Sequence, residues 1–256
     1  MLVNDADVKT REVTQWQGLH LFHFAMSSCS QKVRIVFREL DLPFTPHPIN
    51  LMKDEQQSNW YLGVNPKGEV PVLVHNGVVH TESNDIIQYI DENFARPEKS
   101  LLPQSESERH IMQTLLDMEN DLHGDLRTVT FTYLAPDMKN RAGDTESLGF
   151  IGRFHSAFQI LDERLASNTY LIGDRLTLLD ISWFITLFRL DLAGYPLFEH
   201  PKLAAYFLRI SKRPSFRHEV NAGPLSMRFA GAAFRRLSRI LSRSLARDYE
   251  LWKKQT

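Results

Sequence analysis

Short apolar runs alternate with helically spaced apolar residues in the first third of the chain. Residues 19–24 form an apolar run that predicts a strand, although His20 and His23 interrupt it. Small polar residues follow, and a helical pattern then begins with Val33, Ile35, Val36, Phe37 and Leu40. A strand, a tight polar turn and the start of a helix are therefore expected within about a dozen residues.

The alternation continues after this helix. Residues 44–50 predict a second strand, and Pro43 and Pro46 mark it as an edge strand because proline cannot donate a ladder hydrogen bond. Residues 54–61 fit an irregular helix or a loop. Residues 65–74 form a turn that leads into a third strand.

A hairpin and a helix complete this region. Asn76-Gly77 lies between apolar runs, which predicts that residues 72–75 and 78–80 pair as antiparallel strands. Residues 81–84 are expected to cap a helix. Its apolar residues would cover the sheet: Ile86, Ile87, Tyr89 and Ile90. The predicted order is β-α-β-α-β-β-α, so residues 17–95 are expected to form one domain after a polar extension at residues 1–16.

Strand signals nearly vanish beyond a polar linker with two prolines at residues 96–108. Residues 109–224 therefore predict an all-helical domain. Apolar residues at i, i+4, i+7 and i+11 indicate one long helix: Ile111, Leu115, Met118 and Leu122. Another helix is expected from about 148 to 165, and two shorter helices should open at Pro201 and Pro214.

Thr177 and Asp180 have the spacing of a capping box, in which two side chains satisfy free backbone N–H groups at a helix start. Leu176 and Ile181 stand where a hydrophobic staple requires apolar residues. The helix that follows, residues 181–192, is apolar on nearly every side. It is therefore expected at the centre of the helical domain's core.

The composition is that of a globular protein and limits the chemistry. Of the 256 residues, 43% are hydrophobic and 24% are charged, and there is one cysteine. One cysteine excludes an internal disulfide framework and a cysteine-based zinc site, and it fits a reducing compartment. No apolar run approaches the roughly 18 residues of a membrane span. Residues 1–16 lack the apolar core of a signal peptide, and the histidines lack metal-site spacing, so a cytoplasmic protein without a metal is expected.

The charge is unevenly distributed along the chain. Residues 225–256 contain six Arg and two Lys but one Asp and one Glu, a net charge of +6. The formal net charge of the whole chain is −1, so the remainder carries −7. An apolar stripe runs through this tail: Ala230, Phe234, Leu237, Leu241 and Leu245. A basic amphipathic helix packed over the acidic body is expected, with membrane-surface or partner binding as the alternative. Nothing else in the sequence supports nucleic-acid binding.

The chain's only cysteine, Cys29, lies in the first predicted turn with Ser27, Ser28 and Ser30 around it. The first turn of a helix presents free N–H groups and a partial positive charge, which stabilise a thiolate. A neighbouring hydroxyl can donate a hydrogen bond to such a thiolate. Cys29 is therefore a candidate reactive thiol. The alternative is a helix cap followed by one buried, inert cysteine.

Several motifs, each at a predicted junction between elements, together resemble the cytosolic glutathione S-transferases over residues 18–220. They are Ser27-Ser28-Cys29-Ser30-x-x-Val33-Arg34, Ile49-Asn50-Leu51-x-Lys53-Asp54, Asn65-Pro66, Val70-Pro71, Glu82-Ser83 and Thr177-x-x-Asp180. The first motif resembles the zeta class, which includes maleylacetoacetate isomerases and tetrachlorohydroquinone reductive dehalogenases. The resemblance implies an α/β thioredoxin-like N-terminal domain, an all-α C-terminal domain, a homodimer, and glutathione as the cofactor.

The resemblance also assigns glutathione-binding residues. Val70-Pro71 is expected to carry a cis peptide bond that presents the Val70 backbone to the cysteinyl part of glutathione, with an ordinary trans proline as the alternative. The helix start at Glu82 and Ser83 would receive the γ-glutamyl carboxylate, and Glu82 its ammonium. Simple N-capping by Ser83 is the other interpretation. Gln57 or Lys53 would reach the glycine end, and a solvated surface role is open for Lys53.

The same resemblance assigns the thiol chemistry. Ser27 takes the position of the hydroxyl that stabilises the glutathione thiolate, with Ser28 beside it. Cys29 takes the position of the cysteine that resolves a glutathionyl adduct by thiol–disulfide exchange in the dehalogenases. Met26 stands where the isomerases often have an Arg, which argues against an acidic, maleyl-type substrate.

The site for the electrophile is expected between the two domains, along the long helix after the linker. Its candidate contacts would share one helical face: Asn120, His123, Arg127 and Thr130. A solvated or interdomain salt-bridged face is the alternative.

The sequence therefore predicts a glutathione-dependent enzyme that carries out substitution or thiolytic cleavage of a small aromatic electrophile. Dehalogenation follows from the likeness to the dehalogenases, and aryl-ether cleavage from a similarity to β-etherases in the Asn-Pro-x-Gly and Glu-Ser segments. A maleylacetoacetate-type cis–trans isomerase is the alternative. A function of another class, membrane-surface or partner binding with little catalysis, follows from a similarity of residues 30–34 and the basic tail to ganglioside-induced differentiation-associated proteins.

Overall fold

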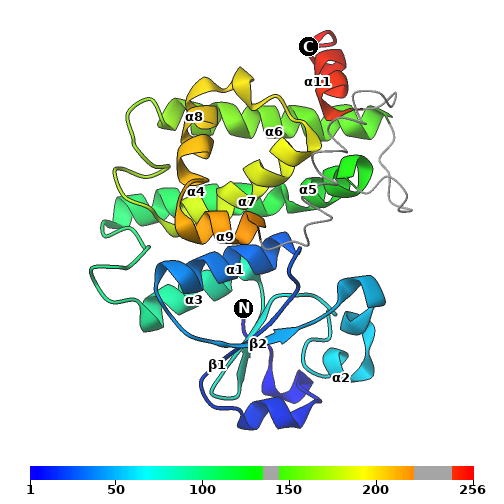
Figure 1. Ribbon diagram of the computed structural model, residues 1–256, viewed down its shortest axis with the longest axis vertical. Helices are drawn as coiled ribbons and strands as arrows, with labels where there is room; N and C mark the ends of the chain where they lie inside the picture. Colours follow the sequence, from blue (N-terminus) through cyan, green and yellow to red (C-terminus); the bar gives the residue numbers. More distant parts are fainter. Residues whose placement is uncertain (135–143, 222–243) are drawn as a thin grey trace. The chain divides into compact units, whose positions relative to one another are not determined.

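The computed structural model describes residues 1–134, 144–221 and 244–256. Its contacts divide the chain into two compact units, Met1–Leu102 and Pro103–Thr256. The first unit combines a sheet with helices, and the described part of the second is helical (Figure 1).

A four-stranded sheet in the order β2-β1-β3-β4 forms the centre of the first unit. β1 (Leu19–His23) pairs in parallel with β2 (Thr45–Pro48) and antiparallel with β3 (Val72–His75). β3 pairs antiparallel with β4 (Val78–His80) through a turn in which Asn76 and Gly77 have φ of 48° and 83°. Positive φ at both positions is what a two-residue hairpin turn requires. The hairpin and the edge position of β2 are confirmed.

Helices and short helical turns surround this sheet. α1 (Ser28–Glu39) and α3 (Ser83–Phe94) pack against each other on one side of it (Figure 1). Residues 54–61 are irregular, as predicted. They contribute to a run of short turns: η3 (Leu51–Lys53), η4 (Glu55–Gln57) and α2 (Asn59–Leu62).

Residues 1–16 belong to the core of the first unit, although their polar composition predicted only an extension. The segment forms η1 (Asp5–Asp7) and η2 (Arg11–Gln15), and Val8 and Val13 are buried. These two side chains join a cluster that also contains Phe22, Tyr61, Val64, Val72, Val74 and Val79. The Val3 N–H donates to the carbonyl of Val79 in β4 at 3.0 Å. A few well-placed valines therefore fix a segment whose average composition is polar.

The second unit is built from helices. They are α4 (Glu106–Asp121), α5 (His123–Val129), α6 (Asp144–Arg164), α7 (Leu178–Ala193), α8 (Pro201–Ile210), α9 (Pro214–Asn221) and α11 (Leu245–Lys253), with a π-helical turn η5 (Thr130–Leu134) and a 3-10 turn η6 (Leu197–Glu199). The prolines open α8 and α9 as predicted. The helix predicted from Ile111 to Leu122 is confirmed as α4, but its expected continuation to Thr130 is wrong, because a second helix, α5, begins after Leu122. Leu122 and Leu126 are both buried, so the apolar spacing continues through the break.

α7 is buried on nearly every side, as its apolar sequence predicts. The Trp183 indole N–H donates to the carbonyl of Leu115 in α4 at 3.0 Å. The hydroxyls of Ser182 and Thr186 each donate to the buried carboxylate of Glu119 at 2.8 Å. These bonds satisfy the oxygens of a buried carboxyl group and join α7 to α4.

Candidate functional site

The loop between β1 and α1 holds the candidate thiol residues at the start of a helix. Ser27 is the N-cap of α1, and its Oγ accepts a hydrogen bond from the Ser30 N–H at 3.2 Å. The Ser27 N–H donates to the Phe24 carbonyl at 3.2 Å, and the Phe24 N–H donates to Ser30 Oγ at 3.3 Å. Ser27, Ser28 and Cys29 are all partly exposed. The cap fixes the Ser27 oxygen as an acceptor, and the hydroxyl can still donate its proton to a ligand.

Arg34 is a residue of this site whose role was not predicted. Its guanidinium is buried, and it donates to the Phe24 carbonyl at 3.1 Å and to the Ala25 carbonyl at 2.9 Å. It also lies 3.2 Å from Nδ1 of His23. The Arg34 fork therefore holds the backbone just before Ser27. The signal in the sequence was a charged residue inside the apolar stripe of α1.

Cys29 occupies the second residue of α1 and is partly exposed. A thiol sealed in the core would be fully buried, so the position agrees with an accessible thiol in the positive field of the helix start. Ser28 precedes it as the first residue of α1.

The peptide bond between Val70 and Pro71 is cis, as the resemblance implied. Val70 is 9% exposed and lies two residues before the start of β3, with Pro71 between them. Within the described residues, no backbone hydrogen bond involves the Val70 N–H or C=O. A backbone donor and acceptor at a strand end can pair with an extended peptide ligand.

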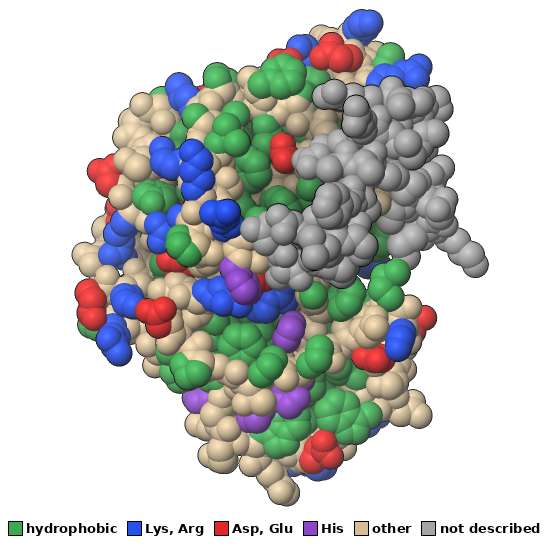
Figure 2. All heavy atoms as spheres, viewed as in Figure 1, with side chains coloured by type: hydrophobic (Ala, Val, Ile, Leu, Met, Phe, Trp, Pro, Cys, Tyr) green, Lys and Arg blue, Asp and Glu red, His purple; other side chains and the backbone are tan. Residues whose placement is uncertain are grey.

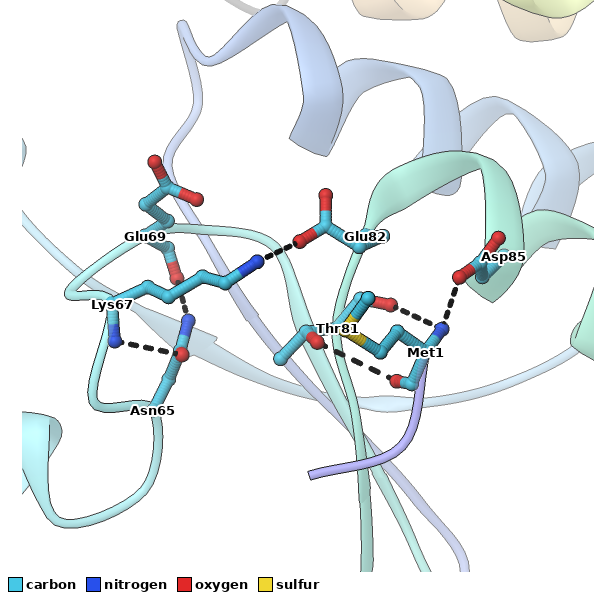
Figure 3. Close-up of polar contacts among 7 residues, drawn as sticks. All are labelled: Met1, Asn65, Lys67, Glu69, Thr81, Glu82 and Asp85. Atoms are coloured by element: carbon cyan, nitrogen blue, oxygen red, sulfur yellow. Dashed lines mark hydrogen bonds and ion pairs between the residues drawn. The ribbon is translucent and has the colours of Figure 1, made fainter. Parts of the chain in front are cut away.

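α3 begins without a side-chain cap. Glu82 is its N-cap residue, with φ of 65° and ψ of 113°, and its side chain makes no capping hydrogen bond. Ser83 is the first helical residue, so N-capping by Ser83 is wrong. The helix does start within residues 81–84, but the Glu82 side chain forms no cap. The Glu82 carboxylate instead lies 2.5 Å from Lys67 Nζ (Figure 3). The N-terminus of a helix can receive an anion, and the Glu82 side chain does not block it with a cap.

The two candidates for the glycine end lie on short turns. Gln57 ends η4 and is exposed. If Gly68 carried a Cβ atom, this atom would lie 2.9 Å from the amide nitrogen of Gln57. The Gln57 side chain therefore lies against the loop that leads to Val70. Lys53 is exposed at the end of η3. Only Gln57 thus has a described contact with this loop.

The candidates for the electrophile lie in the second unit and do not share one continuous helix. Asn120 is exposed near the end of α4, and His123 begins α5. Arg127 is exposed, and its guanidinium lies 5.8 Å from the centre of the Phe131 ring. The Thr130 hydroxyl donates to the Leu126 carbonyl at 2.8 Å. The division at Leu122 breaks the expected single face.

The described end of the basic tail packs within the second unit. Of the predicted apolar stripe, residues 230–241 lie outside the described residues, and Leu245 is buried. α11 starts at Leu245, and Ser244 is its N-cap. The single helix predicted for the whole tail is therefore interrupted at Ser244. The Tyr249 hydroxyl lies 2.9 Å from Nδ1 of His155 in α6, and Lys253 pairs with Glu199 of η6 at 3.0 Å. This end of the tail is therefore held by specific contacts.

The described residues contain neither a membrane-spanning helix nor a metal-binding cluster. None of their helices is long and apolar enough to cross a membrane. Within the same ranges, no group of three or more His, Cys, Asp or Glu side chains is arranged to hold a metal ion. Figure 2 shows histidine and hydrophobic side chains together on the visible surface of the sheet-containing unit. The stacked rings of Trp16 and His47, 4.6 Å apart, belong to this unit.

Comparisons with known proteins agree with this arrangement. Residues 21–98 match the glutathione S-transferase N-terminal domain, and residues 111–209 match the C-terminal domain. A glutathione S-transferase of Dianthus caryophyllus is 30% identical over 194 residues, which cover 72% of this chain and 85% of the relative. A maleylacetoacetate isomerase of Aspergillus fumigatus is 26% identical over 208 residues, covering 77% and 87%.

A solved structure shares the fold. A glutathione transferase homologue from Drosophila mojavensis with bound glutathione matches with a TM-score of 0.73 at 22% identity, covering 86% of this chain and 97% of that chain. The predicted combination of a thioredoxin-like domain and a helical domain is thereby confirmed. With both domains matched in order and a relative of 30% identity covered over most of its length, the chain belongs to the glutathione S-transferase family, whose members are enzymes that use glutathione.

Proposed function

We propose that this enzyme binds glutathione on the Met1–Leu102 unit and uses its thiolate for substitution or thiolytic cleavage of a small aromatic electrophile. The observation that carries the proposal is the position of Ser27, a partly exposed hydroxyl fixed at the N-cap of α1. Glutathione supplies the nucleophilic sulfur when it is bound. The protein supplies the groups that orient the tripeptide and lower the pKa of its thiol.

Each end of the tripeptide has candidate partners in this unit. The backbone N–H and C=O of Val70, before Pro71, suit the cysteinyl backbone. The uncapped start of α3 at Ser83 suits the γ-glutamyl carboxylate, and the Glu82 carboxylate suits the ammonium. Gln57 is the better candidate for the glycine end, because its side chain lies against the loop before Val70, whereas Lys53 has no described contact there.

Ser27 would donate a hydrogen bond from its hydroxyl to the thiolate sulfur of glutathione. The Ser30 N–H already bonds to the Ser27 oxygen, which leaves the oxygen in one position and polarises the O–H bond toward a further acceptor. The Arg34 guanidinium donates hydrogen bonds to the carbonyls of Phe24 and Ala25, and these bonds restrain the loop before Ser27. The partial positive charge at the start of α1 adds to the stabilisation of an anion at this position.

Cys29 supports a second, reductive chemistry at the same place. Its partial exposure at the helix start suits a thiol that resolves a glutathionyl adduct. Alkylation of the native protein distinguishes the two roles. Rapid labelling that glutathione blocks would place Cys29 in the site, whereas labelling only after denaturation would leave a serine-type transferase.

A maleylacetoacetate-type isomerase is the second candidate function, because maleylacetoacetate isomerases are among the relatives. The presence of Met26 in the loop beside Ser27 favours an uncharged aromatic substrate instead. Asn120, His123 and Arg127 remain the proposed substrate contacts in the second unit, and a homodimer remains the proposed assembly.

Turnover with a panel of electrophiles tests the proposal. Wild-type enzyme should consume glutathione with a halogenated aromatic compound or an aryl ether, and an isomerase would convert a maleyl substrate without consuming glutathione. Ser27→Ala should slow every productive reaction by about tenfold or more, the scale of one hydrogen bond to a charged group. Ser105→Ala is a matched control, because Ser105 caps α4 through a similar bond to the Glu108 N–H. Normal turnover in Ser27→Ala would contradict the assigned role.

A further inference from the structure

The loop before Val70 is shaped by buried side chains that leave one lysine projecting from it. Asn65 is 2% exposed, and its side chain accepts from the Lys67 N–H at 3.2 Å and donates to the Glu69 carbonyl at 2.9 Å. The buried Tyr61 hydroxyl donates to the same carbonyl at 2.7 Å. Gly68 adopts a φ of 63° to complete the turn. The protein therefore fixes the backbone of Lys67 from beneath (Figure 3).

The Lys67 side chain reaches the start of α3. Its ammonium lies 2.5 Å from Oε1 of Glu82, and the two side chains are 51% and 40% exposed. The hydrogen bond to Glu82 raises the pKa of Lys67 above its ordinary value, so the ammonium stays charged. An exposed ion pair of this kind contributes little to folding stability. Stability alone therefore does not account for so well-supported a pair.

We propose that Lys67 is a specificity-determining residue that, together with Glu82, recognises the α-amino acid end of glutathione. This inference rests on the proposed function and adds Lys67 to the same site. The γ-glutamyl group carries an ammonium and a carboxylate on one carbon atom, so it presents two opposite charges side by side. The Lys67–Glu82 pair also presents two opposite charges side by side. When glutathione binds, the Lys67 ammonium would pair with the ligand carboxylate and the Glu82 carboxylate with the ligand ammonium. All four charges then have a partner.

Two analogues of glutathione separate this role from a general effect on the loop. γ-Aminobutyryl-cysteinylglycine lacks the α-carboxylate and keeps the ammonium. Lys67→Met should weaken glutathione binding by about tenfold, the loss expected for one charge-assisted bond, and should change the affinity for this analogue less than about twofold. Lys67→Arg should keep most of the affinity for glutathione, since it retains the charge.

Lys99→Met is the matched control, because Lys99 forms an exposed ion pair with Asp41 elsewhere in the same unit. It should leave both affinities unchanged. Glu82→Gln should weaken glutathione but spare glutaryl-cysteinylglycine, which lacks the ammonium. Calorimetric titration of the full-length protein gives each dissociation constant.

Three outcomes would overturn the inference. Equal losses for both ligands in Lys67→Met would mean that the lysine shapes the loop only. Unchanged glutathione affinity in this variant would remove Lys67 from the site while leaving the proposed function intact. Failure of wild-type protein to bind glutathione would overturn the proposed function, and the inference with it.

Discussion

The starts of α7 and α3 differ in how the protein treats the free N–H groups of a helix. At α7 the structure has the predicted capping box, and the Asp180 carboxylate accepts from the Thr177 N–H at 2.7 Å and the Thr177 hydroxyl at 2.8 Å. It also accepts from the Leu171 N–H at 2.9 Å and the Tyr206 hydroxyl at 2.6 Å. Asp180 and Thr177 are almost completely buried. Burial raises the pKa of Asp180 above its ordinary value despite these four donors.

At α3 no side chain caps the helix, and Ser83 is partly exposed. The Glu82 carboxylate turns to Lys67 instead of to the helix N–H groups. Both starts carry a hydroxyl residue near an acidic one, so the two sequences look alike. The closed start at α7 stabilises a core, and the open start at α3 offers donors to a ligand. Hydrogen-bond partners, more than residue types, distinguish structural from binding helix ends.

Removal of the Asp180 carboxylate should have the largest effect. Asp180→Ala leaves several buried donors without an acceptor, so it should lower the free energy of unfolding by about 4 kcal/mol. Thr177→Ala loses one hydroxyl of the box and should cost about 1 kcal/mol. Urea denaturation measures both losses, and glutathione affinity of the folded protein should stay normal. A melt that does not move for either variant would show that this helix start is not structural.

Acidification should weaken another buried polar group of the helical unit. His200 is 2% exposed, its ring lies 4.8 Å from that of His155, and burial lowers its pKa from 6.5 to about 4. The unfolded chain therefore binds a proton at higher pH than the folded protein, and stability is lost as the pH falls from 6.5 toward 4.

From pH 7 to pH 5 this group alone should cost about 2 kcal/mol. Thermal melts at both pH values, for wild type and His200→Asn, isolate its share because other titrating groups cancel in the difference. Equal pH dependence in the two proteins would exclude His200 as the cause.

Ser83→Ala should change glutathione binding without changing stability. Loss of one hydrogen bond to a charged carboxylate should weaken glutathione binding by about 1–2 kcal/mol. The melting temperature should stay unchanged, because Ser83 does not cap α3. Calorimetry and a thermal melt on the same sample test both statements. A lower melting temperature with normal affinity would make the α3 start structural, like that of α7.

Local patterns predicted much of the fold. The Asn76-Gly77 turn and the Thr177–Asp180 box are set by residues close in sequence, and the structure has both. The division at Leu122 and the burial of Val8 and Val13 depend on packing against distant residues. Periodicity carries no information about such packing, so these features were missed.

In the candidate site, too, local features were predictable from the sequence and contacts between separate elements were not. The N-terminal position of Ser27 and Cys29 on α1 follows from a local motif. Two other contacts join separate elements: the hydrogen bonds from Arg34 to the carbonyls before Ser27, and the Lys67–Glu82 ion pair. Neither contact leaves a mark on the spacing of residues along the chain.

The central claim is that the Ser27 hydroxyl stabilises the glutathione thiolate. The pKa of the bound glutathione thiol tests this claim most directly. Cys29→Ser removes the chain's only cysteine, so the ultraviolet absorbance of thiolate then reports glutathione alone. In this background the bound thiol should titrate below its free value of about 8.5. Adding Ser27→Ala should raise the pKa by about 1–2, the equivalent of one hydrogen bond to a charged group. An unchanged pKa in the double variant would contradict the account.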